Sequence, residues 1–126
     1  MDILNRDAVL AFTTKDGSTI REILAPRNSS LETQSLAEAT LEPGSETQAH
    51  FHPQTEEWYY LLSGTGLMAV EGETHSVTVG DGIAIPAGTK HQIRNTGSVD
   101  LVFLCGCVPA YRDTDTVMCE ALLPPG

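Results

Sequence analysis

Closely spaced turn signals are the feature of this sequence that most restricts its fold. Gly recurs at short intervals, often beside Asp, Pro or Ser, and this composition is typical of tight turns. These signals lie at Asp16-Gly17, Pro43-Gly44, Ser63-Gly64-Thr65-Gly66, Glu71-Gly72, Gly80-Asp81-Gly82, Pro86-Ala87-Gly88 and Asn95-Thr96-Gly97. The runs between them are short and rich in β-branched and aromatic residues. This pattern favours an all-β chain over a helix bundle.

The spacing of the turns predicts a series of short strands. The expected strands are residues 8–13, 19–24, 47–52, 57–63, 66–71, 74–79, 83–86, 91–96 and 99–108. Strands at this spacing are typical of a β-sandwich or β-barrel. The chain has 126 residues, of which 40% are apolar, so it can bury a core but is too short for two domains. We therefore predict one domain over residues 1–126.

One segment does not fit the strand pattern. Residues Ser29–Leu41 are rich in Leu, Ala, Glu and Gln and begin with Ser. Propensity alone predicts a helix there, with Ser29 or Ser30 as its N-cap. The spacing of its apolar residues decides nothing between helix and strand.

The run Val99–Val108 is apolar on both faces apart from Asp100. A strand of this kind is expected to be buried on both sides, in the core or at a subunit interface. Cys105 and Cys107 share one face of it. Two thiols at this spacing could hold a soft metal, but buried structural thiols are the favoured interpretation.

Acidic residues outnumber basic ones by 17 to 7, so the formal net charge is −10. Nucleic acids and anionic membrane surfaces attract basic proteins, so neither is an expected partner. The imbalance is strongest between Asn28 and Thr89, where there are nine acids and no Lys or Arg. Such a field favours a metal cation over a polyanion, although an ordinary acidic surface also explains it.

The three cysteines suggest no disulfide framework, because their number is odd and two of them are only two residues apart. The first residues do not show the basic segment and apolar stretch of a signal peptide. No apolar run approaches the roughly 18 residues of a membrane span. We therefore expect a cytoplasmic protein.

Three of the four histidines and one carboxylate form a possible metal site. His50 and His52 are two residues apart on an extended segment, so both side chains leave the same face. Glu57 opens an aromatic strand, where an unpaired carboxylate is costly to bury. Metal ligation would remove that cost, and an exposed strand end is the alternative. His91 begins a new strand after a turn, a short strand and a second turn.

Imidazole with carboxylate suits Fe, Mn, Ni, Zn, Co or Cu as divalent ions, rather than Ca²⁺ or a thiolate site. We expect one such divalent transition metal ion per chain. If the ion is octahedral, four protein ligands leave two positions for a substrate, water or O₂. His75 is expected at the surface, outside the site.

Two motifs in the chain match the cupin superfamily. The first motif, G-x5-H-x-H-x4-E-x6-G, is met by Gly44, His50, His52, Glu57 and Gly64. The second, G-x5-P-x4-H-x3-N, is met by Gly80, Pro86, His91 and Asn95. The motifs span residues 44–64 and 80–95. The sequence therefore resembles a small single-domain bacterial cupin of the cupin 2 conserved barrel type.

This resemblance implies a double-stranded β-helix, the jelly-roll barrel of two sheets. It also implies that His50, His52, Glu57 and His91 are metal ligands inside the barrel. Residues 29–41 would then form a strand, against their propensity. The tail, about residues 109–126, is similar to that of many such cupins, which often carry His-Glu-Asp-Thr there. This chain has Asp113-Thr114-Asp115-Thr116, which lacks the His and the Glu.

The barrel mouth needs polar groups other than the ligands. Tyr59 shares the strand face of Glu57, and Gln48 shares the face of His50 and His52, so both are candidate catalytic residues. A packed core Tyr is the alternative for Tyr59. The other expected pocket residues are apolar: Met68 or Val70, Ile83 or Ile85, and Ile93. Arg94 is expected to point away from the metal.

The small cupins that this sequence resembles carry labels such as sugar-phosphate isomerase, oxalate-decarboxylase-like protein and polyketide cyclase. These labels indicate a scaffold and not one reaction. We expect a metal-dependent enzyme that isomerises, cyclises, decarboxylates or oxygenates a small oxygenated metabolite. The alternative is a non-catalytic binding or sensing module that uses the same pocket.

The ligand and the assembly can also be predicted. Because basic residues are scarce around the pocket, a chelating ketone, enol or carboxylate is a better ligand than a sugar phosphate. A homodimer is expected, because Phe51, Trp58 and Tyr60 together with the apolar run at 99–108 offer more apolar surface than one barrel should expose.

Overall fold

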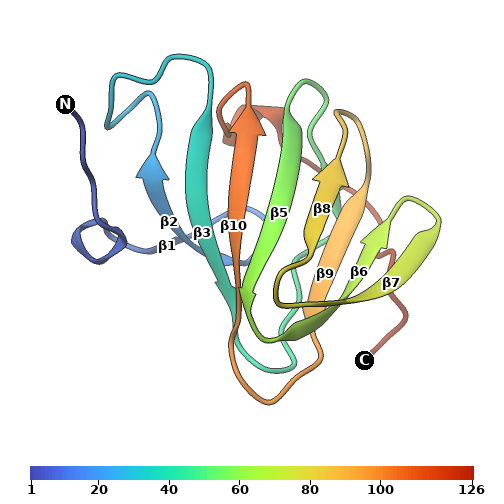
Figure 1. The fold of residues 1–126 in the computed structure, drawn as a ribbon. Coiled ribbons are helices and arrows are strands. Elements are labelled where there is room, and N and C mark those ends of the chain that lie inside the picture. Colours follow the sequence, from blue (N-terminus) through green and yellow to red (C-terminus); the bar gives the residue numbers. More distant parts are fainter.

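The computed structural model describes residues 1–126 as two antiparallel β-sheets that pack face to face in a jelly-roll barrel (Figure 1). The six-stranded sheet contains, in spatial order, β1 (Phe12–Thr13), β2 (Thr19–Leu24), β3 (Ser35–Leu41), β10 (Leu101–Val108), β5 (Glu56–Ser63) and β8 (Gly82–Ile85). The five-stranded sheet contains β11 (Val117–Met118), β4 (His50–Phe51), β9 (His91–Asn95), β6 (Thr65–Val70) and β7 (Glu73–Thr78). The predicted all-β jelly-roll fold is confirmed.

Buried and exposed side chains alternate along β5, which gives this strand one face toward the barrel interior. Its inward residues Glu57, Tyr59 and Leu61 are buried, and its outward residues are exposed. Apolar side chains from both sheets meet between them and form one cluster: Ala39, Leu41, Tyr59, Leu61, Met68, Val77, Ile85, Ile93, Leu101, Phe103 and Cys105. The carboxylate of Glu57 thus lies in the same inward row as the core.

Residues 29–41 do not form a helix. Ser35–Leu41 is the strand β3, and the residues before it form turns. The helix predicted from propensity is wrong, and the strand implied by the family resemblance is confirmed for Ser35–Leu41 only. The reason is tertiary: β3 lies between β2 and β10 and pairs with β10 from Leu41↔Leu101 to Ser35↔Cys107. That ladder outweighs a propensity difference of a few tenths of a kcal/mol per residue.

Several strand boundaries also differ from the expectation. Residues 8–13 yield only β1, after a short 3-10 helix at Arg6–Ala8, and residues 47–52 yield only β4. A second 3-10 helix, Asp113–Asp115, and the strand β11 follow in the tail. The expected burial of 99–108 on both faces holds only in part, because Val108 is 48% exposed. Neither helical segment has the length and hydrophobicity that a membrane-spanning helix requires.

Candidate metal centre

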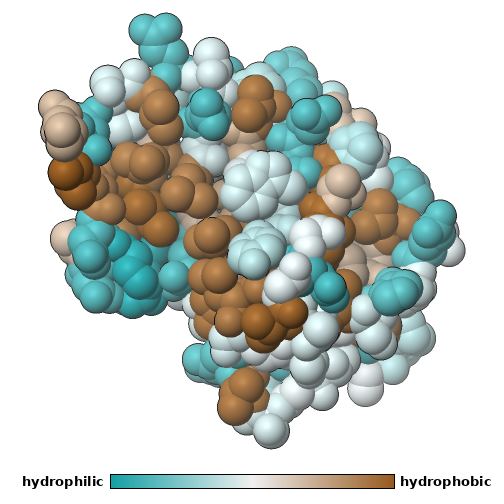
Figure 2. All heavy atoms as spheres, viewed as in Figure 1, coloured by the Kyte–Doolittle hydropathy of each residue, from teal (hydrophilic) through white to brown (hydrophobic).

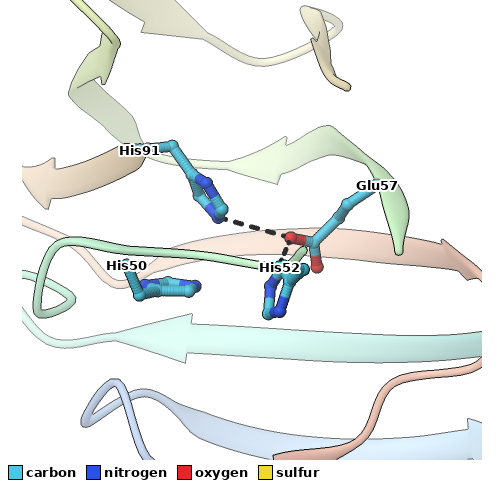
Figure 3. A group of neighbouring side chains, drawn as sticks. All are labelled: His50, His52, Glu57 and His91. Atoms are coloured by element: carbon cyan, nitrogen blue, oxygen red, sulfur yellow. Dashed lines mark ion pairs between the residues drawn. The ribbon is translucent and has the colours of Figure 1, made fainter. Parts of the chain in front are cut away.

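The four predicted ligand residues converge inside the barrel (Figure 3). His50 on β4 and His91 on β9 are direct cross-strand partners, His52 follows β4, and Glu57 comes from β5 in the other sheet. Their ligand atoms all lie within 4.8 Å of one another. All four residues are buried, and His91 is 0% exposed. The structure thus brings together the residues that the two motifs singled out.

Each imidazole ring is oriented by a backbone carbonyl. Nδ1 of His50 lies 2.7 Å from the carbonyl oxygen of Gln48, and Nδ1 of His91 lies 2.9 Å from that of Thr89. Nδ1 of His52 lies 3.1 Å from the carbonyl oxygen of Asp115. A carbonyl can only accept, so Nδ1 is the nitrogen that carries hydrogen in each ring. In the neutral form of each ring, Nε2 therefore carries the lone pair that metal ligation requires.

Glu57 is the negative group among the three rings. Its Oε1 lies 3.3 Å from Nε2 of His52 and 3.4 Å from Nε2 of His91. Burial alone would raise the pKa of Glu57, but the adjacent rings of His52 and His91, when protonated, outweigh burial and lower it to about 2. The carboxylate is therefore ionised at neutral pH and available to a cation.

Two ligand atoms have no hydrogen-bond partner although they are fully buried: Oε1 of Glu57 and Nε2 of His91. A buried polar atom left in this state costs roughly 1–3 kcal/mol. A cation between the four residues would satisfy both atoms at once. Three imidazole nitrogens and one carboxylate oxygen are the donors that a divalent transition metal accepts, so the residues present fit such an ion.

The C-terminal tail holds the loop that carries His52. Besides its carbonyl, Asp115 uses its carboxylate to accept hydrogen bonds from the backbone N–H groups of Gln54 and Thr55 at 2.9–3.3 Å. The Thr116 hydroxyl lies 3.3 Å from Nδ1 of His52. The Asp-Thr pair of the tail thus positions a candidate ligand. Sequence reasoning noted the pair but assigned it no role.

The cavity at this centre has a volume of about 40 Å³ and lies between different strands from those expected. Its lining residues are Thr14, Ile20, Glu22, Ser35, Ala37, His50, His52, Glu57, Cys105, Cys107 and Tyr111. The predicted apolar wall is therefore wrong. Ile85 and Ile93 are core residues, and Met68, Val70 and Ile83 line a separate surface pocket beside His75. β2, β3 and β10 supply the actual wall.

The two predicted catalytic side chains lie in different settings. Tyr59 is 3% exposed, with its ring 4.5 Å from that of Phe103 and 6.0 Å from that of His91. Burial raises the pKa of its phenol well above 10. Gln48 is exposed, and it is its backbone carbonyl that contacts His50. The expectation that the Gln48 side chain shares the inward face of His50 is corrected, because the segment before β4 is not a regular strand.

Other predictions about neighbouring residues can also be compared with the structure. Cys105 and Cys107 are buried free thiols, and Sγ of Cys107 donates to Oε2 of Glu57 at 3.3 Å. His75 is exposed and lies outside the centre, as predicted. Arg94 points away from it and pairs with Glu46 at 3.0 Å.

Comparison with known proteins agrees with this architecture. The family model for the Cupin domain matches residues 37–107. The chain is 46% identical over 114 residues to the uncharacterized protein MJ1618 of Methanocaldococcus jannaschii, covering 90% of this chain and 91% of that protein. It is 38% identical over 69 residues to the oxalate-binding protein of Thermotoga maritima, covering 55% and 57% of the two chains.

A solved structure shows the same fold. The polyketide cyclase RemF from Streptomyces resistomycificus matches with a TM-score of 0.75 at 24% identity, covering 86% of this chain and 79% of that one. The family model spans the strands from β3 to β10 and therefore contains all four residues of the candidate metal centre. The chain belongs to the cupin family.

Proposed function

We propose that this protein is a mononuclear metal-dependent enzyme that acts on a small oxygenated organic metabolite. The observation that carries the proposal is the pair of fully buried ligand atoms, Oε1 of Glu57 and Nε2 of His91, that have no hydrogen-bond partner. Cavities with a few convergent polar groups are the usual places for such chemistry. His50, His52, Glu57 and His91 would hold one divalent transition metal ion.

A bound metal ion of this kind supplies Lewis-acid or redox chemistry to an oxygen-containing ligand. The protein contributes orientation and exclusion of water. The carbonyls of Gln48, Thr89 and Asp115 fix the three rings, and the buried Tyr59 packs beside His91. We retain Tyr59 as a candidate contact for the reacting ligand. Isomerisation, cyclisation, decarboxylation and oxygenation are the reaction types compatible with such a site.

We further propose that the ligand is a chelating ketone, enol or small carboxylate and not a sugar phosphate. No Lys or Arg lines the cavity, so a phosphate group would meet no cation there besides the metal. The similarity to an oxalate-binding protein supports a small carboxylate-type ligand. The cavity volume of about 40 Å³ also favours a small molecule.

A calorimetric screen of metal-loaded protein tests this proposal. We expect acetylacetone or glycolate to bind to the loaded protein and not to chelator-treated protein, and fructose 6-phosphate to bind more weakly than either. Tight binding of the sugar phosphate, with none of the chelating compounds, would overturn the proposed ligand class. Binding without turnover of any bound compound would favour the binding or sensing module.

We also propose a homodimer formed through the outer face of the six-stranded sheet. Trp58, Tyr60 and Leu62 on β5 are 43–46% exposed, and Val108 on β10 is 48% exposed. The space-filling view of this face shows hydrophobic residues gathered over its left part, toward β2 and β3, and at its lower centre, with paler residues between them (Figure 2). Contiguous apolar surface of this kind marks interaction sites, and two-fold association is the commonest solution.

Light scattering at micromolar concentration is expected to give twice the mass of one chain. The double variant Trp58→Lys/Tyr60→Lys should shift the protein toward monomer, because it places two charges in the apolar face. Val79→Lys is the matched control, since Val79 is 56% exposed and lies outside that face. A monomeric wild-type protein would contradict the proposal.

The state of the cysteines supports a reducing compartment. All three thiols are free, and Cys105 and Cys107 are buried. We propose that the protein works in the cytoplasm, where such thiols stay reduced.

A further inference from the structure

Asp16, in the turn between β1 and β2, directs its carboxylate at the metal centre although it belongs to neither cupin motif. Its Oδ2 lies 3.6 Å from Nε2 of His50, and its side chain is only 14% exposed. The backbone carbonyl of Asp16 accepts a hydrogen bond from the N–H of Gln48 at 2.7 Å. This bond ties the turn to the segment that leads into β4.

The other carboxylate oxygen of Asp16 is held by its own turn. Oδ1 accepts hydrogen bonds from the Thr14 hydroxyl at 2.7 Å, the Ser18 hydroxyl at 2.6 Å and the Ser18 N–H at 2.9 Å. Three donors occupy the acceptor capacity of one carboxylate oxygen. The side chain is therefore fixed, and Oδ2 is the free acceptor that faces the centre.

Asp16 is not one of the four grouped ligands. The ligand atoms of His50, His52, Glu57 and His91 lie within 4.8 Å of one another, and Asp16 falls outside that group. Nε2 of His50 is the ligand atom that its carboxylate approaches. This placement suits contact with a molecule held at the centre better than it suits a fifth bond to the ion.

The charged residues around the cavity limit the net charge of a ligand that can bind there. Glu22, which lines the cavity together with Glu57, is paired with Arg27. The ammonium of Lys15 is engaged with the carbonyls of Asp113 and Thr116. The negative charges of Asp16 and Glu57 thus have no Lys or Arg partner. Together they equal the charge of one divalent cation, so a dianionic ligand would enter a site that is already neutral.

We infer that Asp16 accepts a hydrogen bond from a hydroxyl group of the ligand bound at the metal centre, so that the site selects hydroxy acids and hydroxy-ketones over dicarboxylates. This inference rests on the proposed function and names the ligand class within it. A hydroxyl offers the donor that Oδ2 lacks, whereas a second carboxylate would place like charges in contact.

Asp16→Asn is the sharpest test, because the change is isosteric. The Asn oxygen can keep the three donors from Thr14 and Ser18, which leaves the NH₂ group to face the centre as a donor. Affinities for glycolate and oxalate are measured by calorimetry on zinc-loaded wild-type and variant protein. We expect the ratio of glycolate to oxalate affinity to fall about 10-fold or more in the variant. Zinc content and melting temperature should stay near the wild-type values.

Two further measurements separate hydrogen bonding from other causes. Wild-type protein should bind glycolate at least ~10-fold more tightly than methoxyacetate, which lacks the hydroxyl hydrogen, and Asp16→Asn should reduce that preference. The control Asp81→Asn alters a carboxylate that accepts from the backbone N–H of Thr78 in a different turn, and it should leave both ratios unchanged.

The possible outcomes are distinct. If zinc-loaded wild-type protein binds the acids but both ratios are the same in Asp16→Asn, the role of Asp16 is overturned while the proposed function stands. If wild-type protein binds glycolate no more tightly than oxalate and no more tightly than methoxyacetate, the inference fails whatever the variant shows. If neither acid binds to the loaded wild-type protein, the proposed ligand class itself fails, and the inference with it.

Discussion

Replacing His91 with alanine is expected to reduce the metal content of the purified protein from near one ion per chain to near zero. His91 is 0% exposed, and its Nε2 has no hydrogen-bond partner among the protein atoms. Mutation of a residue that only hydrogen-bonds to a metal ligand typically lowers metal affinity 10–100-fold. Loss of a ligand itself should therefore lower the affinity by more than ~100-fold. Elemental analysis after dialysis against metal-free buffer measures the effect.

His75→Ala is the matched control for that experiment. His75 is an exposed residue on β7, and it lies outside the grouped ligand residues. Its substitution should leave the metal content near one per chain. Equal loss of metal in the two variants would contradict the assignment of the centre, whereas loss in the His91 variant alone would support it.

Gly64→Ala should lower the free energy of unfolding by about 2–5 kcal/mol. Gly64 has a φ of +86°, and a Cβ there would lie 2.7 Å from the carbonyl oxygen of Asp100 and 3.0 Å from Cα of Leu101. The left-handed conformation costs roughly 1–2 kcal/mol for an L-residue, and overpacking adds about 1–3 kcal/mol. Both close atoms are backbone, so neither can rotate away. Urea denaturation followed by circular dichroism measures the loss.

Gly44→Ala separates the two causes. Gly44 occupies the opposite end of the same motif with a φ of +81°, but a Cβ there would meet nothing within 4 Å. Only the conformational cost applies, so we expect a loss of about 1–2 kcal/mol. If both variants lose the same free energy, the close approach of the Asp100 backbone has no energetic effect and the prediction for Gly64 is wrong.

Local patterns in the sequence were sufficient to predict the all-β fold and the residues of the metal centre. Gly at positions such as 64 marks turns because few other residues tolerate a positive φ. Alternation placed Tyr59 on the inward face beside Glu57, and both are buried. The resemblance of the two motifs to those of cupins identified the four residues that the structure groups together.

Long-range pairing decided what these local patterns left open or predicted wrongly. Residues 35–41 have helix-favouring composition, yet the ladder to β10, 60 to 72 positions away, makes them a strand. The same ladder brings Ser35 and Cys107 to the cavity wall, where an apolar wall from other strands was expected. Asp16 and Asp115 reach the centre from opposite ends of the chain. The register between distant strands decides which of these side chains meet in the barrel. No local periodicity in the sequence encodes that register.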